Sequence, residues 1–194
     1  SENLVVSALY FNLQMDMLLH TEPGFRTKNI LVAKLIYESQ DFNGFTKERA
    51  LAERARSQLL NEKLLACPFI EYHQSGYESI IDKTYGTNYV NVKGETAYLN
   101  IMYVSPQFFQ MFDIDIEEGA IPEKSGRNIY VLNRAAMKAM NFSSLEEAAV
   151  VEDNRKRKDA NAPMEPIVAV VKDYYNGHLS AGAAPILYNV SGSG

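Results

Sequence analysis

The sequence predicts a mixed α/β fold of the α+β class, in which helices cover a mixed β-sheet. An apolar, mostly β-branched run from Ile167 to Val171 is typical of a strand buried on both faces, and it is too short to span a membrane. The stretch from Thr46 to about Ala66 has the spacing of a long helix, and that from Glu95 to Val104 alternates as a half-exposed strand does. Because a buried strand needs cover on both faces, we expect the rest of the chain to supply strands beside it and helices over it.

The N-terminal half begins with a dense apolar pattern from Asn3 to Leu19, which predicts a helix that ends at Pro23 and Gly24. Its apolar surface extends too far round the helix for an ordinary solvent-facing one, so either a partner buries it or it continues into a membrane. Thr46 is expected to cap the long helix. Strands are predicted at 29–37, at 69–74 and at 89–93, and the last should pair with the 95–104 strand across Gly94.

In the C-terminal half, Pro106 is expected to open a short helix that continues to Phe112, because proline suits the first helical position. A strand at 128–132, a short helix at 133–140 and another helix at 144–150 follow. The charged stretch 152–166 has no apolar period and predicts a loop, in which acidic residues bracket the basic run Arg155–Lys158. The central strand comes next, and a short strand at 185–188 closes the chain.

Composition narrows the classes of partner. The 194 residues carry 24 acidic and 19 basic side chains, a net charge of -5, which argues against a nucleic-acid surface. Cys67 is the single cysteine, so no intramolecular disulfide forms, which fits a reducing compartment and equally an extracytoplasmic domain that does without disulfides. No segment reaches the about 18 to 20 apolar residues that a membrane span needs, and no signal-peptide pattern is present, so the chain as given is expected to be soluble.

No set of residues has the pattern of an active site, so the sequence predicts a protein that is not an enzyme and binds no metal or cofactor. The three histidines lie far apart and lack metal-ligand spacing. Asp173, His178 and Ser180 supply the residue types of a hydrolytic triad, but no strained turn presents the serine, and Asp173 is more simply read as a turn cap at a strand end. The pairs Glu117-Glu118 and Glu146-Glu147 are read as solvated faces.

Tyrosine content leaves a binding function open. The chain has 12 tyrosines, several of them between Tyr72 and Tyr103. Exposed aromatic rings in a concave pocket would suit an extracellular module that binds sugars or peptides, although half-buried sheet faces use tyrosine as freely. The residues for such a pocket would be Tyr72, Tyr77, Tyr85, Tyr89 and Tyr98.

Several short motifs occur in an order that resembles the periplasmic core domain of MacB-like and FtsX-like ABC transporter permeases. The first motifs are Gly24-Phe25 followed by Asn29-Ile30-Leu31, and then a long helix that ends near Pro68. The later motifs are Val104-Ser105-Pro106-Gln107-Phe108-Phe109 with Phe112, Ile114 and Gly119; Val131-Leu132-Asn133 with Ala136; and Ile167 to Tyr174 with Leu179 and Pro185. One departure is Ala169, where the family usually has glycine, which puts a close backbone approach there in doubt.

The resemblance implies an arrangement in two lobes. Residues 1–22 would extend a membrane helix, residues 23–94 and 166–194 would form a membrane-proximal lobe, and residues 95–165 would form a second small α/β lobe inserted into it. The motif residues taken over from the family are structural. They are Gly24, Phe25, Asn29, Pro106, Phe108, Phe109, Gly119, Asn133, Lys172, Asp173 and Pro185.

The resemblance also implies a function and a set of partners. Such a domain lies on the extracytoplasmic (periplasmic) face of the inner membrane as part of an integral membrane protein, does no chemistry, and transmits ATP-driven motion of membrane helices to a substrate or partner. Its partners would be its own transmembrane helices, a cytoplasmic ATPase domain or subunit, a second permease protomer, and a periplasmic adaptor or an exported peptide or lipoprotein. Residues 1 and 194 would then emerge on the same face of the domain.

Overall fold

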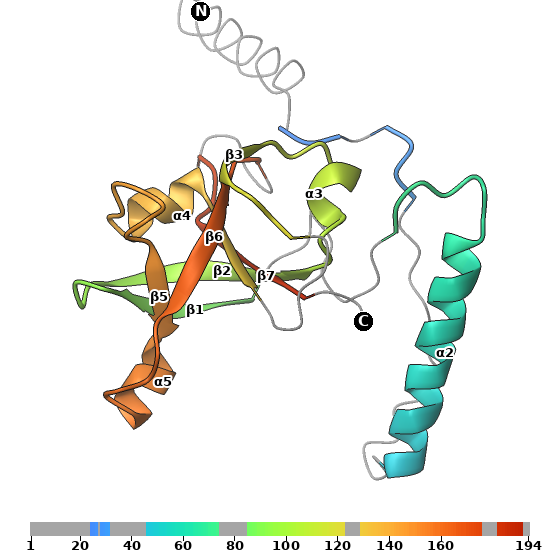
Figure 1. Cartoon of the computed structure of the whole chain (residues 1–194), viewed down its shortest axis with the longest axis horizontal. Coiled ribbons are helices and arrows are strands. Elements are labelled where there is room, and N and C mark those ends of the chain that lie inside the picture. Colours follow the sequence, from blue (N-terminus) through green and yellow to red (C-terminus); the bar gives the residue numbers. More distant parts are fainter. Residues whose placement is uncertain are drawn as a thin grey trace, which may run out of the picture.

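A computed structural model describes residues 24–26, 28–31, 46–73, 85–122, 129–175 and 182–191. It confirms the α+β class, because helices pack on a seven-stranded mixed sheet of order β3-β6-β4-β7-β2-β1-β5 (Figure 1). The strands are β1 (Tyr85–Asn91), β2 (Thr96–Val104), β3 (Ile116–Gly119), β4 (Ile129–Asn133), β5 (Ala149–Glu152), β6 (Glu165–Val171) and β7 (Ile186–Val190). The helices are α2 (Lys47–Leu65), α3 (Phe108–Met111), α4 (Arg134–Ala139) and α5 (Asp153–Lys158).

The sheet closes into a barrel. Strand β5 pairs with β1 on one side and with the first residues of β6 on the other, so β6, β4, β7, β2, β1 and β5 form a closed ring. The short strand β3 lies outside the ring and pairs with the C-terminal half of β6. The ring takes strands from both predicted lobes, and the division into a membrane-proximal and an inserted lobe stays a prediction.

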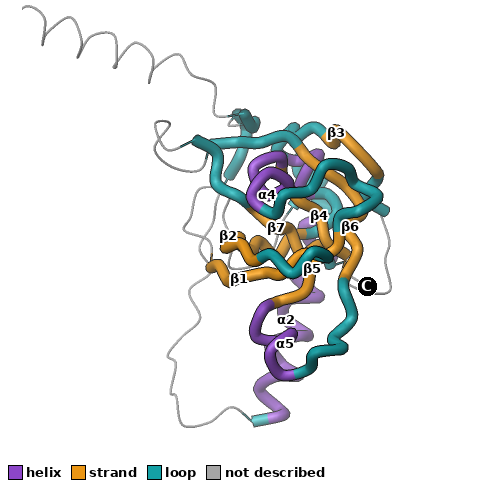
Figure 2. The backbone as a smooth tube through the Cα atoms, turned by 90° about the vertical axis from the view of Figure 1, so that its left-hand side faces the viewer, coloured by secondary structure: helices purple, strands orange, loops and turns teal. Residues whose placement is uncertain are grey.

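Two hydrophobic cores lie on the two faces of this ring. The inner core contains side chains from all six ring strands, among them Leu99, Leu132, Val150, Ile167 and Leu187, together with α4. The outer core joins one face of β2, β4, β6 and β7 to the aromatic side chains of α3. Helix α4 therefore covers one end of the barrel, and α5 lies at the opposite end in both views (Figures 1 and 2).

The predicted central strand is confirmed as β6. Ala169, Val170 and Val171 are fully buried, and alternate residues of the strand contribute to the outer and inner cores. The hairpin across Gly94 is also confirmed, with Tyr89 opposite Ala97. Strand β2 is more buried than predicted, because it lies between β1 and β7, and Ile101 and Met102, which point to opposite faces, are both buried.

Three predicted elements are wrong. Residues 69–73 form no strand. Residues 144–150 form no helix, and the last two of them belong to β5, because Val150 and Val151 pair with β1 and bury their side chains there. The predicted loop 152–166 contains the helix α5, which periodicity could not reveal because none of its residues is buried. Strand β3 was not predicted.

The long helix α2 is confirmed, and it stands apart from the barrel (Figure 1). Its residues Leu51 and Leu59 are 55% and 53% exposed in the chain alone. None of the helices in the described ranges combines the length and the apolar character required to cross a membrane. The predicted helix at 3–19, the predicted strand beyond residue 31, and residues 1 and 194 lie outside the described residues.

Candidate functional site

Several of the motif residues lie at the end of the barrel that α4 covers, and Asn133 is the most connected of them. Its Oδ1 accepts a hydrogen bond from the backbone N–H of Ala136 at 3.0 Å, which caps α4, and another from the N–H of Ile186 at 2.8 Å. Its Nδ2 donates to the carbonyl oxygen of Ala184 at 2.8 Å. Because Asn133 is fully buried, these bonds tie the start of α4 to the start of β7 away from water.

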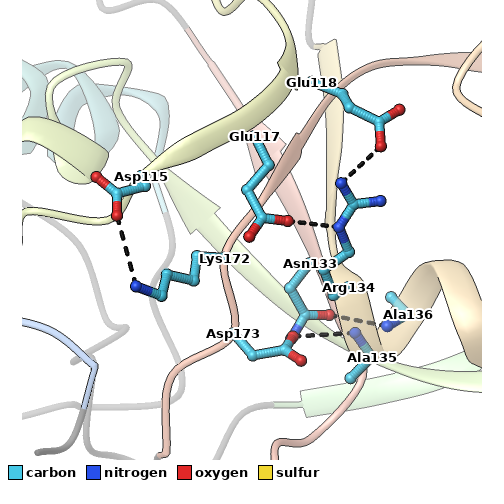
Figure 3. A network of polar contacts seen from close by, with 9 residues as sticks. All are labelled: Asp115, Glu117, Glu118, Asn133, Arg134, Ala135, Ala136, Lys172 and Asp173. Carbon is cyan, nitrogen blue, oxygen red and sulfur yellow. Dashed lines mark hydrogen bonds and ion pairs between the residues drawn. The ribbon is translucent and has the colours of Figure 1, made fainter.

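Asp173 and Lys172, which directly follow β6, hold two neighbouring elements (Figure 3). Oδ1 of Asp173 accepts a hydrogen bond from the N–H of Ala135 at 2.9 Å, in the first turn of α4. Burial raises the pKa of the Asp173 carboxyl, an effect larger than the lowering by this hydrogen bond. Lys172 donates its backbone N–H to the carbonyl oxygen of Asp115 at 2.9 Å, and its Nζ lies 3.7 Å from Oδ2 of the same residue. The end of β6 is thus attached to both α4 and the segment before β3.

Arg134 connects α4 to β3. Its guanidinium bonds the carboxylate of Glu117 and lies 2.6 Å from Oε1 of Glu118 (Figure 3). The hydrogen bonds from Arg134 to Glu117 and then to Glu118 raise the pKa of the guanidinium above its ordinary value. Glu117 is exposed and Glu118 is partly exposed, as predicted, and the ion pairs with Arg134 are an addition that the sequence did not predict. The sequence carried no signal for this contact, because it depends on the register of β3 against β6.

Gly119 lets β3 approach the central strand. It adopts a φ of +75°, and a Cβ at this position would lie 2.1 Å from the carbonyl oxygen of Val168 and 2.9 Å from the Cα of Ala169. No side chain fits there, so glycine is required. The doubt raised by Ala169 is resolved by this geometry, since Gly119, directly opposite it, supplies the close approach.

Gly24 and Phe25 attach the N-terminal segment to the end of β6. Gly24 has a φ of +80°, and a Cβ on it would lie 3.0 Å from the carbonyl oxygen of Asp173. The Phe25 ring contacts Tyr174 edge to face, with centroids 5.4 Å apart, and contacts Phe112 at 6.1 Å. The N–H of the next residue, Arg26, donates to the carbonyl oxygen of Phe112 at 2.7 Å. The described segment that precedes the fold is thus fixed to both the central strand and α3.

The remaining motif residues pack or turn the chain around the outer core. Phe108 and Phe109 are 1% and 2% exposed, and Phe109 lies 5.1 Å from the ring of Tyr188, centroid to centroid. Pro106 lies in the turn before α3, and Asn29 has a φ of 60°. The carbonyl oxygen of Pro185 accepts a hydrogen bond from the N–H of Asn100 at 2.9 Å.

The described contacts at this end of the barrel join backbone elements to one another. Within the described ranges, no group of three or more histidine, cysteine, aspartate and glutamate residues could hold a metal ion. His178 and Ser180 of the weighed triad lie outside the described residues.

The tyrosines considered for a sugar or peptide pocket do not share one face. The ring of Tyr98 covers Gly86 on the outer face, whereas Tyr85 and Tyr89 belong to the inner face. Tyr72 is half-buried near the end of the segment that follows α2, and Tyr77 lies outside the described residues.

No family model matches the sequence, and no curated protein matches it. Among solved structures, a domain assigned to a permease protein of Porphyromonas gingivalis is similar with a TM-score of 0.42 and 12% identity over 57% of this chain and 52% of that one. The periplasmic region of MacB from Actinobacillus actinomycetemcomitans is similar with a TM-score of 0.37 and 18% identity over 58% and 56%.

One of these two solved structures is thus a periplasmic region of MacB, and the other is a domain of a protein described as a permease. This chain spans about half the length of each of the two. A TM-score below 0.5 and an identity below 25% do not carry the activity of either protein over to this one.

Proposed function

We propose that this chain is a non-catalytic extracytoplasmic domain of an ABC transporter permease, which transmits the motion of membrane helices to a substrate or partner protein. The observation that carries the proposal is that motif residues from separate parts of the sequence, Gly24-Phe25, Asn133 and Lys172-Asp173, hold the N-terminal segment and α4 to the end of the central strand. Gly24 and Phe25 lie against Asp173, Tyr174 and Phe112, so force applied to the N-terminal segment would reach the central strand directly.

Polar contacts join the elements at this end of the barrel, which favours their motion as a rigid body. Asn133 joins α4 to β7, Asp173 joins α4 to β6, and Arg134 joins α4 to β3. A rigid barrel with a fixed attachment is what a lever requires, because a displacement at the attachment then becomes a displacement of the whole barrel. The motion would come from a cytoplasmic ATPase domain or subunit through transmembrane helices, and a second protomer, an adaptor or an exported peptide or lipoprotein would receive it.

The described chain enters and leaves the barrel at different strand ends, which limits how it can sit on a membrane. Gly24 lies beside Asp173, at the C-terminal end of β6. Ser191 follows β7, which runs antiparallel to β4, whereas β6 runs parallel to β4. This disfavours a simple arrangement in which both described ends of the chain leave from one rim.

The test uses the full-length permease with its ATPase in liposomes whose lipid headgroups carry a quencher. A fluorophore is placed on Lys158→Cys in α5, in a background where Cys67 and any cysteine elsewhere in the full-length protein are replaced by serine, since Lys158 is exposed and Cys67 is the single cysteine of these 194 residues. A lever predicts that ATP changes the quenching, while the distance between labels at Asn88 and Lys158 within the barrel stays constant.

Variants locate the coupling. Phe25→Ala should reduce the ATP-dependent change in quenching while ATP hydrolysis continues, because the attachment to Tyr174 and Phe112 is lost. Tyr98→Ala, which removes a ring that is 55% exposed, should leave the change intact. The proposal is refuted if ATP is hydrolysed by the unaltered protein and the quenching does not respond.

A further inference from the structure

The end of the barrel opposite α4 carries a ring of aromatic and polar side chains. Residues directly opposite each other on paired strands share a face, so Tyr89 and Glu152 lie together, as do Asn189 and both Tyr103 and Tyr130. All belong to the inner face, because their neighbours two residues away fill the inner core. We call this set the rim cluster, and it consists of Tyr85, Tyr89, Tyr103, Tyr130, Glu152, Glu165 and Asn189.

Asn189 is the unusual member of the rim cluster. It is 8% exposed, and its Oδ1 is buried without a hydrogen-bond partner among the residues that the structure describes. An unsatisfied buried acceptor is rare in native proteins, because leaving it unpaired costs about 1–3 kcal/mol. Tyr103 and Tyr130 stand on either side of it, on β2 and β4. The position is therefore suited to receive an N–H donor from outside the described fold.

The charges around Asn189 favour a cation. Burial, followed by the repulsion of Tyr130 and Glu152, raises the pKa of Tyr89. Burial, followed by the repulsion of Glu165, raises the pKa of Tyr130. The rim cluster thus holds two carboxylates beside tyrosine rings. Arg155 already places a guanidinium here, 3.2 Å from Glu165, whereas Glu152 makes no ion pair within the described part of the chain.

We propose that the rim cluster binds an organic cation that carries N–H donors, either a guanidinium or an ammonium group. The donor would bond Oδ1 of Asn189, the charge would face the carboxylate of Glu152, and the faces of Tyr103 and Tyr130 would flank the cation as aromatic rings do in cation–π sites. An anion is excluded by the two carboxylates, and a neutral ligand leaves Glu152 unpaired. This site is separate from the proposed lever, so either can fail without the other.

The 194-residue chain is titrated with two cationic probes, N-acetyl-arginine amide and spermidine. Binding is measured by calorimetry and by the NMR signal of the Asn189 side-chain amide. N-acetyl-citrulline amide, which keeps the shape of the arginine probe and lacks its charge, is the control ligand. Saturable binding of either cation with a shift of the Asn189 signal supports the proposal. Binding of the arginine probe points to a basic peptide side chain, and binding of spermidine alone points to a free polyamine.

Matched variants test the contacts. Tyr103→Ala should raise the Kd for the cation about threefold to fivefold, the range of an exposed cation–π contact, whereas Tyr98→Ala on the outer face of the same strand should not change it. Glu152→Gln should weaken binding by a similar factor, and the exposed Glu146→Gln should not. The proposal is overturned if neither cation binds at millimolar concentration, if citrulline amide binds as well, or if Tyr98→Ala weakens binding as much as Tyr103→Ala.

Discussion

Replacing Asn133 should reveal how much the barrel depends on one buried side chain. Asn133→Ala removes three hydrogen bonds and leaves the N–H groups of Ala136 and Ile186 and the carbonyl of Ala184 without their partner. A hydrogen bond contributes about 1 kcal/mol net, and a buried group left unpaired costs about 1–3 kcal/mol. We therefore expect the free energy of unfolding to fall by about 3 to 5 kcal/mol.

A second variant separates the two roles of Asn133. Serine is a good N-cap, so Asn133→Ser should keep the bond to Ala136 but cannot reach the backbone of 184–186. The free energy of unfolding of Asn133→Ser should therefore be about 1 kcal/mol higher than that of Asn133→Ala. The loss that remains measures the bonds from Asn133 to the start of β7. Asn88→Ala, at an exposed position of β1, is the control and should change stability by less than about 0.5 kcal/mol.

The measurement is urea unfolding of the chain followed by far-ultraviolet circular dichroism. The midpoint should shift at constant slope, because the surface exposed on unfolding is the same in each variant. If Asn133→Ala loses less than about 1 kcal/mol, or no more than Asn88→Ala, the claim that this side chain ties α4 to β7 is wrong.

Three further predictions concern the same end of the barrel. Gly119→Ala should lower the free energy of unfolding, measured with urea, by about 3 kcal/mol or more. Gly94 has a φ of +82° and open space around it, so Gly94→Ala should lower that free energy only by the about 1–2 kcal/mol that a left-handed backbone costs an alanine. Asp173→Asn should gain stability relative to the native protein as the pH rises from about 3 to 7, because a raised pKa means that the native carboxyl loses stability as it ionises; an offset that is constant with pH would contradict this. Phe25→Ala should lower the free energy of unfolding by about 2 kcal/mol, whereas Leu31→Ala should hardly change it, because Leu31 is 91% exposed. Equal losses in the two variants would contradict the attachment of the N-terminal segment through Phe25.

The central strand and the hairpin across Gly94 could be predicted because their signals are local. Five consecutive apolar residues identify β6 wherever its neighbours lie, and a turn glycine between two alternating runs defines the hairpin. Strand β5 could not be predicted in this way, because Val150 and Val151 become a strand only by pairing with β1 and β6. Closure of the ring depends on those same non-local pairs.

The motif residues show the same division between local and non-local information. That Asn133 caps a helix follows from its place between an apolar run and a helical one, but its bonds to 184–186 depend on the register of β4 against β7. Arg134 was missed altogether, since its partners in β3 are far away in sequence. Asn189 carried no signal, because an asparagine in a short apolar strand becomes informative only when its neighbours are known to leave Oδ1 unpaired.

The two ends of the barrel differ in how completely their polar groups are paired, and this difference suggests a division of roles. At the α4 end, Asn133 and Asp173 bond backbone groups of their neighbours, which favours a fixed body. At the rim cluster, Oδ1 of Asn189 has no hydrogen-bond partner and Glu152 makes no ion pair within the described fold, which favours a surface that meets something else. A lever needs both, a fixed attachment and a free end that contacts its load. The two experiments are independent, so a chain that binds cations at the rim but does not respond to ATP would remain a binding domain and would not be a lever.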